Sequence, residues 1–313
     1  MFLVWEVTAG CNLECVFCYN PWRAEGRSIP PDLSTAGMVH LAGRIAEAGP
    51  VSVTLTGGEP LLRGDLEVIA AELAGRGIPA GVATNGMLLD DRRAESLVRA
   101  GVRWFEIPVH GCSPGTVEAL TGRDCIKGTR AAMLAAGRAG ATLTASHAIT
   151  SINYRETADA VKTAFALGAV SMALNRFVPG GAGLDRLDLL PSGEQLGSAL
   201  VDASKAAMQC RGMLVYTGIP VEPCLHDLSR CPGLVFGPCV CGSEKWAVGP
   251  EGELRVCEQS PNVLGSMVTG DFIEMTSSRA VEEFRSREAF PECGRCPSFP
   301  RCGSGCRFLR AYL

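Results

Sequence analysis

The sequence predicts an α/β fold in which a partial, TIM-like (β/α)6 barrel is followed by a small cysteine-rich module. Between residues 1 and 180, short β-rich runs alternate with longer amphipathic patterns, as in a parallel sheet with right-handed crossovers. The 313 residues are enough for one such barrel and a smaller module. Nine of the 15 cysteines follow Pro220, where the composition changes.

Each predicted barrel strand is a short run rich in apolar or β-branched residues. The six runs are 3–8, 51–56, 79–84, 103–109, 141–149 and 169–177. The predicted helices are amphipathic, and several begin near Asp, Ser or Thr and are followed by Gly. They span 32–48, 65–76, 91–100, 129–138 and 155–167. After a Gly-rich break at 179–183, residues 191–211 are predicted to form a bridging helix on the barrel edge.

Composition and charge limit the classes of function. The net charge is -4 and no block of Lys or Arg stands out, so nucleic acid is not an expected partner. The N-terminal apolar stretch is interrupted by Glu6 and is too short for a signal peptide or a membrane span, so we expect a cytoplasmic protein without a membrane partner. In a reducing cytosol, this many cysteines indicate metal ligands rather than disulfides.

A loop directly after the first predicted strand contains Cys11, Cys15 and Cys18. Their spacing lets one turn of irregular backbone direct three sulfurs at one point, as an iron-sulfur cluster requires. A zinc site or a ferredoxin cluster is normally closed by a fourth ligand, so three sulfurs leave one iron open to a substrate or cofactor. A zinc knuckle is disfavoured for that reason, and a disulfide framework because such frameworks belong to small secreted chains.

The spacing C-x3-C-x2-C, with Phe17 just before the third cysteine, resembles the signature of the radical S-adenosylmethionine (radical SAM) enzymes. The resemblance implies a 4Fe-4S cluster whose open iron chelates the methionine part of S-adenosylmethionine (AdoMet). An electron from the cluster then cleaves the cofactor to a 5'-deoxyadenosyl radical, which abstracts hydrogen from C-H bonds. The family's fold is a partial barrel, and in such barrels the chemistry lies at the C-terminal ends of the strands.

A second motif follows the second predicted strand. Gly57, Gly58, Glu59 and Pro60 match the family's GGEP motif, in which the glycine backbone approaches the methionine amino group and the acidic residue helps to hold that cation. Further residues are expected to contact the cofactor, either because they resemble the family's positions or because they lie at strand ends: Phe17, Thr84, Asn85, Ser146 and Asn175. Taken singly, each of these is an ordinary turn or a satisfied structural residue.

Three cysteines fit neither a cluster loop nor the C-terminal module. Cys125 and Cys210 are expected to be buried thiols that act as small apolar side chains. Cys112 follows the fourth predicted strand at the barrel mouth, where a thiol can deliver a hydrogen atom to a substrate radical. A purely structural thiol is the alternative for Cys112. His110, His147 and Arg176 are also expected at the mouth.

The C-terminal cysteines follow a distinctive spacing: Cys241-x10-Gly252-x4-Cys257, then Cys293-x2-Cys296-x5-Cys302-x3-Cys306. This order resembles the SPASM domain, a C-terminal extension of many radical SAM enzymes that holds auxiliary 4Fe-4S clusters. Residues 245–248 and 253–256 flank a turn signal and predict a hairpin that brings two of these cysteines to one end. A pair of zinc sites is the alternative.

The resemblance assigns Cys241, Cys257 and Cys306 to one auxiliary cluster, and Cys239 and Cys224 compete to be its fourth ligand. The other cluster would take Cys293, Cys296 and Cys302. The usual last cysteine of the domain would lie beyond Cys306 and is not found. This second cluster is therefore expected to borrow Cys224 or Cys231, to use Cys306, to take a non-cysteine ligand, or to be absent.

Glu258 occupies a position where some SPASM enzymes carry an acidic base, so we expect it to accept a proton from the substrate. The expected division of the chain is a radical SAM barrel (1–184), a bridging helix and linker (185–222) and a SPASM domain (223–313).

The favoured function is oxidation or cross-linking of a ribosomally made peptide by hydrogen abstraction. The alternatives are an epimerase or dehydrogenase of a small natural product such as an aminosugar and, from another class, a non-catalytic iron-sulfur electron carrier or zinc scaffold. The family implies an electron donor such as flavodoxin or ferredoxin. Only ten residues precede Cys11, so a peptide substrate is expected to need a separate recognition protein.

Overall fold

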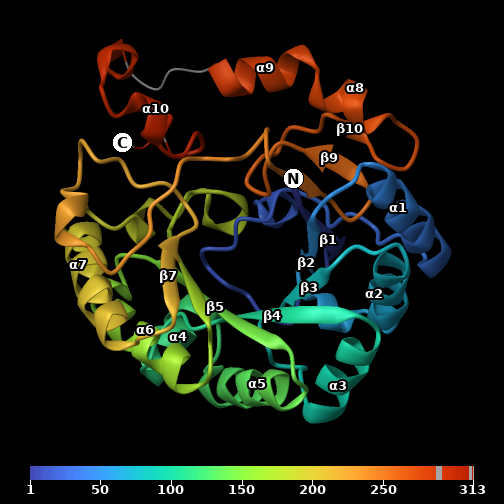
Figure 1. Cartoon of the computed structure of the whole chain (residues 1–313), viewed down its shortest axis with the longest axis horizontal. Coiled ribbons are helices and arrows are strands. Elements are labelled where there is room, and N and C mark those ends of the chain that lie inside the picture. The colour runs from blue at the N-terminus through green and yellow to red at the C-terminus, as the bar shows by residue number, and fades with distance from the viewer. Residues whose placement is uncertain (287–290, 310–311, 313) are drawn as a thin grey trace.

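The structure is a computed structural model that describes residues 1–286, 291–309 and 312. Within these residues one sheet of ten strands, in the order β10-β9-β8-β1-β2-β3-β4-β5-β6-β7, curls into an open barrel (Figure 1). Its first seven strands pair in parallel in chain order. They are β1 (Phe2–Thr8), β2 (Ser52–Gly57), β3 (Ala80–Ala83), β4 (Val102–Pro108), β5 (Thr142–Ile149), β6 (Ser171–Arg176) and β7 (Leu214–Thr217).

The helices that connect these strands cover the outside of the barrel. They are α1 (Thr35–Glu47), α2 (Leu66–Gly75), α3 (Asp91–Arg99), α4 (Pro114–Thr121), α5 (Ile126–Arg138), α6 (Thr157–Ala166) and α7 (Gly193–Gln209). Figure 1 shows them as an arc from α1 on the right, through α5 at the bottom, to α7 on the left. Because right-handed crossovers put every helix on the same face of the sheet, the inner face is left for a cavity.

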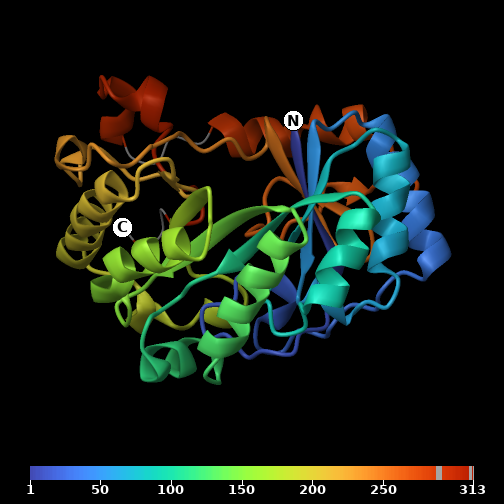
Figure 2. The same ribbon diagram turned by 60° about the horizontal axis from the view of Figure 1, so that its bottom comes forward.

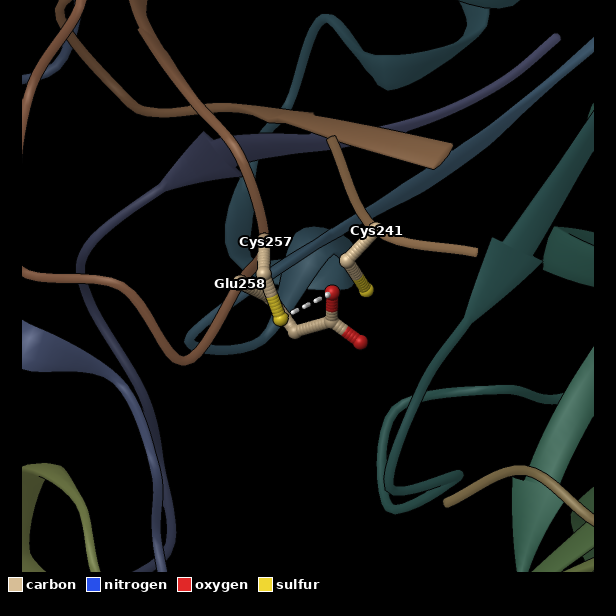
Figure 3. Close-up of side chains that lie close together, drawn as sticks. All are labelled: Cys241, Cys257 and Glu258. Atoms are coloured by element: carbon tan, nitrogen blue, oxygen red, sulfur yellow. Dashed lines mark hydrogen bonds between the residues drawn. The ribbon is translucent and has the colours of Figure 1, made fainter. Parts of the chain in front are cut away.

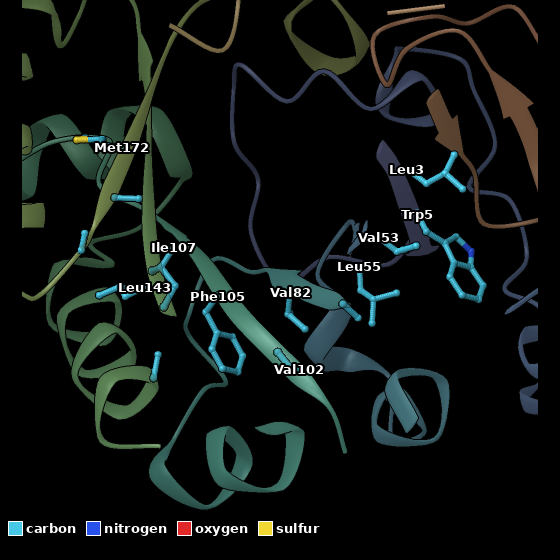
Figure 4. Packing of buried hydrophobic residues seen from close by; sticks show 14 of the residues in the cluster. Leu3, Trp5, Val53, Leu55, Val82, Val102, Phe105, Ile107, Leu143 and Met172 are labelled. Atoms are coloured by element: carbon cyan, nitrogen blue, oxygen red, sulfur yellow. The ribbon is translucent and has the colours of Figure 1, made fainter. Parts of the chain in front are cut away.

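Side chains alternate between the outer core and the barrel interior along each strand. Phe105 and Ile107 of β4 are buried against the outer helices, as is Leu143 of β5 (Figure 4). The intervening Glu106, and Ser146 of β5, face the opposite way and line the interior. The same strands that build the apolar core therefore deliver polar groups to the centre of the barrel.

The six predicted strands and the partial barrel are confirmed, but two barrel elements were missed. Helix α4 has local signals: the Ser113 hydroxyl accepts the N–H of Thr116, Pro114 stands at the first position, and Gly122 ends the helix with φ 83°. Strand β7 pairs in parallel with β6. Because parallel neighbours need a crossover, α7 is the helix of the sixth βα unit and not only a bridge on the barrel edge.

The predicted C-terminal hairpin is confirmed, as β8 (Lys245–Val248) and β9 (Glu253–Arg255) pair in antiparallel fashion. Strand β8 also pairs in parallel with β1, so the hairpin and β10 (Gly265–Ser266) extend the barrel sheet. The remaining helices lie together on one side of the barrel (Figures 1 and 2): α8 (Phe272–Thr276), α9 (Arg279–Ser286) and α10 (Phe299–Cys302). The three-part domain division stays a prediction. In the described ranges no helix is both long and apolar enough to cross a bilayer.

Candidate active site

An open cavity with about 2250 Å³ of empty space, part of it open to solvent, occupies the barrel interior. Cys11, Cys15 and Cys18 of the loop after β1 line it, as do Lys245 of β8 and Glu258 after β9. Seven of the predicted cofactor-binding residues also line it: Phe17, Gly57, Gly58, Thr84, Asn85, Ser146 and Asn175. The strand ends therefore bring together in one space residues that are far apart in the sequence.

The cysteine loop has the donor set of an iron-sulfur cluster. The N–H of Cys18 donates to the carbonyl of Cys15 (3.1 Å), and the N–H of Leu13 donates to the Cys11 sulfur (3.5 Å), so the loop folds around its thiols. Burial raises the pKa of Cys15, and the neighbouring charges of Cys18 and Cys11 raise it further. Three mutually repelling thiolates in a buried loop are stabilised by metal ions, so these residues fit the cluster that the sequence predicted.

Arg23 is a member of the site that the sequence analysis missed. Its guanidinium donates to the carbonyl of Leu13 (3.3 Å) and lowers the pKa of all three loop cysteines, against the larger effect of burial. A cation beside the thiolates favours a negatively charged cluster. The only local signal was a basic residue shortly after the third cysteine, and such residues are common on surfaces.

The glycines of the GGEP motif are required by the close approach of two backbone segments. A Cβ atom on Gly57, whose φ is +142°, would lie 2.3 Å from the Thr8 carbonyl oxygen. A Cβ on Gly58 would lie 2.1 Å from the carbonyl oxygen of Gly10. The N–H of Gly58 donates to the Thr8 carbonyl (2.8 Å). These glycines therefore hold the start of the cysteine loop against β2, while the predicted contact with methionine stays a prediction.

Glu59 connects the ends of two strands. One carboxylate oxygen accepts the hydroxyl of Thr84 (2.6 Å) and the N–H of Leu61 (3.0 Å), and the other accepts the N–H of Asn85 (2.8 Å). Burial raises the pKa of Glu59 above its ordinary value, and these hydrogen bonds offset only part of that increase. Neither Glu59 nor Pro60, which begins the following 3-10 helix, lies in the cavity wall. The carboxylate thus orders the loop after β3 in this structure, and its role toward the methionine cation stays a prediction.

Asn85 carries this order to the cysteine loop. Its side-chain amide donates to the Asn12 side chain (2.7 Å), between the first two cysteines, and its oxygen accepts the N–H of Met87 (3.0 Å). The other predicted contacts, Ser146 on β5 and Asn175 on β6, line the cavity from the opposite strands. Asn85 is therefore bound to the loop, whereas Ser146 forms a hydrogen bond with Glu106 and the Asn175 side chain packs against Gly218.

The neutral ring of His110 lies beside the ring of Phe17, one of the predicted cofactor contacts. The rings of Phe17 and His110 meet edge to face at 4.7 Å. The Nδ1 atom of His110 accepts the N–H of Ala148 (3.2 Å), so its remaining proton is on Nε2. Burial and the nearby His147 lower its pKa to about 3. The ring lies in the cavity wall, so His110 supplies a fixed hydrogen-bond donor there.

Cys112, predicted to deliver a hydrogen atom, lies outside the cavity wall. Its sulfur contacts the hydroxyl of Thr163 (3.7 Å), and its N–H donates to Glu156 (2.5 Å). Burial raises its pKa. These contacts favour the structural alternative, and catalysis by Cys112 stays a prediction.

Glu258 and Lys245 form an ion pair (2.5 Å) in the cavity wall. Burial alone would raise the pKa of Glu258, but Lys245 lowers it below its ordinary value. The Cys257 thiol donates to Glu258 (3.5 Å), and ligand atoms of Cys241, Cys257 and Glu258 lie within 4.8 Å of one another (Figure 3). An ionised carboxylate therefore stands between the open cavity and two predicted cluster ligands.

The first predicted auxiliary set comes together. The pKa of Cys239 is raised by its hydrogen bond to Cys241 and by burial. Cys241 in turn forms a side-chain hydrogen bond with Cys257. Burial raises the pKa of Cys306, and the charge of Cys239 raises it further. Four thiols from the hairpin, the preceding loop and the C-terminal turn thus lie near one another, a donor set that fits a 4Fe-4S cluster.

The other predicted ligands lie in or near the C-terminal turns. Cys293, Cys296 and Cys302 are partly exposed and Cys224 is exposed, whereas Cys231 is buried in the main core. Burial raises the pKa of Cys302, and Glu222 and Cys224 raise it further. Cys125 and Cys210 are buried, as expected.

Comparison with known proteins agrees with this geometry. The family model for the radical SAM superfamily matches residues 5–164, and that for the SPASM iron-sulfur cluster-binding domain matches 239–297. The chain is 26% identical to a PqqA peptide cyclase of Granulibacter bethesdensis, over 98% of this chain and 82% of that protein. Its fold is similar to native anSMEcpe with bound AdoMet (TM-score 0.77, 18% identity, 98% and 89% of the chains) and to Streptococcus suis SuiB bound to precursor peptide SuiA (0.75, 15%, 97% and 71%).

Proposed function

We propose that this chain, which belongs to the radical SAM superfamily and carries a C-terminal SPASM domain, oxidises or cross-links a ribosomally made peptide. The observation that carries the proposal is the cavity, which has three cluster-type thiols in one part of its wall and the Lys245–Glu258 pair in another. The matches to PqqA peptide cyclases over almost the whole chain support a peptide substrate.

The chain's own residues hold and orient the reacting groups. Cys11, Cys15 and Cys18 would hold the cluster that binds AdoMet, and together these groups supply hydrogen-atom abstraction from a C-H bond. Asn85 keeps the cysteine loop in place through Asn12.

Glu258 is proposed as the proton acceptor. Removing two hydrogens from a substrate takes away two protons and two electrons in total, so abstraction of one hydrogen atom leaves one proton and one electron to be accepted. Glu258 is ionised and lines the cavity, and Lys245 beside it offsets its charge. Cys239, Cys241, Cys257 and Cys306 would hold an auxiliary cluster next to this carboxylate, where an electron acceptor is needed. An electron donor such as flavodoxin or ferredoxin and a separate peptide-recognition protein remain part of the proposal.

The first experiment tests the radical chemistry without any substrate. The protein is reconstituted anaerobically with iron and sulfide, reduced and incubated with AdoMet, and 5'-deoxyadenosine is measured. We expect it to form, and to be lost in the Cys11→Ala/Cys15→Ala/Cys18→Ala variant. Cys210→Ala is the matched control, because this thiol is buried in the main hydrophobic core and away from the cavity wall. Zinc in the loop, or no 5'-deoxyadenosine, would refute the assignment.

The second experiment tests the substrate class. Short peptides encoded beside this gene are added to the reduced enzyme, and their masses are compared before and after the reaction. Loss of two hydrogens per modification, together with faster release of 5'-deoxyadenosine, is the expected result. If aminosugars accelerate that release and peptides do not, the peptide proposal is wrong.

A further inference from the structure

The loop that follows Pro220 lies against the last cysteine turn of the chain. The carbonyl of Glu222 accepts the N–H groups of Leu225 and His226, both at 3.1 Å, so residues 222–226 form a tight turn with Cys224 inside it. A Cβ on Gly305 would lie 1.8 Å from a carboxylate oxygen of Glu222, so this side chain packs directly against the backbone of Gly305. An ion pair with Arg176 of β6, buried on both sides, anchors Glu222 there.

On the other side of this contact are the C-terminal turns, which contain the second predicted set of cluster ligands, Cys293, Cys296 and Cys302. The N–H of Cys296 donates to the Cys293 carbonyl (3.1 Å), and the N–H of Phe299, at the start of α10, donates to the Cys296 carbonyl (3.0 Å). The N–H of Gly305 then donates to the Cys302 carbonyl (3.1 Å). Successive turns thus connect the three cysteines to Gly305, which Glu222 contacts.

Three thiolates leave a 4Fe-4S cluster one ligand short, and two of the candidates for the fourth are used elsewhere. Cys231 is 4% exposed and packs in the main hydrophobic core. Cys306 lies with Cys239 in the first auxiliary set. Cys224 is exposed, and it lies in the turn of residues 222–226, which packs through Glu222 against the turn that follows Cys302.

Glu222 is the remaining rival. It is 5% exposed, and its Oε2 atom has no hydrogen-bond partner in the described part of the chain. This second carboxylate oxygen makes Glu222 a candidate ligand. However, Glu222 already pairs with Arg176, and the iron of such clusters is held by thiolate rather than carboxylate ligands.

We propose that Cys224 is the fourth ligand of a second auxiliary 4Fe-4S cluster, which it shares with Cys293, Cys296 and Cys302. The cluster would join the loop after β7 to the C-terminal turns, two segments that the chain separates by about seventy residues. The inference rests on the proposed function only in that the SPASM domain holds iron-sulfur clusters, and it is independent of the substrate.

Iron content and spectroscopy test the ligand directly. In a Cys11→Ala/Cys15→Ala/Cys18→Ala background only auxiliary clusters remain. There, Cys224→Ser is expected to lose about four irons per chain, or to leave a three-iron cluster with its own EPR signal, because one corner has no protein ligand. Cys231→Ser is the matched control and should keep the full iron content. Near-ultraviolet circular dichroism checks that each variant folds.

Two results would overturn the proposal. The first is that Cys224→Ser keeps the iron content and EPR spectrum of its parent. The second is that Glu222→Gln loses the second cluster while Cys224→Ser keeps it. Neither result would affect the formation of 5'-deoxyadenosine by the wild-type enzyme, so the failure of this inference is distinguishable from failure of the proposed function.

A labelling experiment needs no variant. Exposed Cys224 should react with iodoacetamide in the apoprotein and should be protected several-fold after anaerobic reconstitution, to the same degree as Cys293 and Cys296, as measured by peptide mass spectrometry. Equal labelling of Cys224 in the two forms would contradict ligation.

Discussion

At the residue scale, the two carboxylates of the cavity differ although both are partly buried near Lys245. Glu258 pairs directly with the ammonium group, and this contact outweighs burial and lowers its pKa. Glu106 is influenced by Lys245 only at longer range, so burial raises its pKa. Such a separation of two carboxyl pKa values is typical of sites in which one group accepts a proton. The contrast could not be seen in the sequence, because Glu106, Lys245 and Glu258 lie on different strands and loops.

Glu258→Gln tests the proton acceptor. The amide keeps the size of the side chain but cannot accept the proton, so we expect the rate of peptide modification to fall by about 100-fold. Cleavage of AdoMet to 5'-deoxyadenosine should continue, because the cysteine loop is untouched. Exposed Glu244 supplies the control, Glu244→Gln, with an unchanged rate. If the Glu258→Gln variant modified the peptide at the wild-type rate, Glu258 would not be the proton acceptor.

His147 makes the stability of the protein sensitive to acid. Its Nδ1 atom contacts the Val109 carbonyl (2.6 Å) and its Nε2 contacts the Thr157 hydroxyl (3.3 Å), and burial lowers its pKa to about 4. The unfolded state therefore binds a proton that the folded state does not, and stability falls as the pH drops below about 6.5. By pH 5 the loss from this group is about 2 kcal/mol.

The variant His147→Asn removes that proton-binding group. Its unfolding free energy, measured by denaturant titration between pH 7.5 and pH 5, should depend less on pH than that of the wild type, even if its stability at neutral pH is lower. His40→Asn, at an exposed position, should leave the slope unchanged. An unaltered slope in His147→Asn would show that other groups cause the acid sensitivity.

At the element scale, the cysteine loop depends on how β2 ends. Backbone contacts between Gly57, Gly58 and residues Thr8 to Gly10 determine where the loop leaves β1, and Glu59 then fixes the turn after β3. The GGEP motif is therefore structural as well as a predicted cofactor contact. A sequence motif indicates that residues act together, but it does not separate these two roles.

Gly58→Ala is expected to displace the cysteine loop. The added Cβ meets the backbone oxygen of Gly10 at 2.1 Å, which cannot move without the loop, so we expect a loss of about 3 kcal/mol in unfolding free energy and a lower iron content of the N-terminal cluster. Gly75→Ala, at the end of α2 with open space around it, should instead raise stability by about 0.5–1 kcal/mol. Full iron binding and wild-type stability in Gly58→Ala would contradict this account.

At the scale of the whole molecule, the C-terminal module is continuous with the barrel. Strand β8 pairs with β1, and Arg255 of β9 forms a buried ion pair with Glu6 of β1. Arg255 also donates to the carbonyls of Glu258 and Ser260, both at 3.2 Å. The same guanidinium thus joins the two parts of the protein and holds the backbone of the proposed proton acceptor.

Arg255→Met should strongly destabilise the protein. It leaves the Glu6 carboxylate buried without its partner, which costs about 3–5 kcal/mol, and the double variant Glu6→Met/Arg255→Met should regain much of that loss. Arg279→Met breaks an exposed ion pair with Glu283 and should cost less than about 1 kcal/mol. Denaturant unfolding of the four proteins, including the wild type, gives the comparison. A cost for Arg255→Met as small as for Arg279→Met would contradict the ion pair's role.

Features that depend on residues close together in the chain could be predicted from the sequence. Three cysteines within one turn, a GGEP turn after a strand, and a hairpin between Cys241 and Cys257 all follow from spacing, because residues a few positions apart have few ways to be arranged. Alternating strand and helix patterns determined the barrel in the same way, since each βα unit is local. Helix α4 carried such signals as well and was overlooked.

Contacts between segments that are distant in the chain became visible only in the three-dimensional fold. The parallel pairing of β8 with β1, the role of α7 as the sixth crossover helix, and the packing of Glu222 against Gly305 join residues that are far apart in the chain. The same holds for Lys245, which keeps Glu258 ionised from thirteen positions away. Such contacts form only when the whole sheet closes. Their stability depends on burial and on interactions between charges that are brought together by the fold, and a local pattern of residues does not predict either.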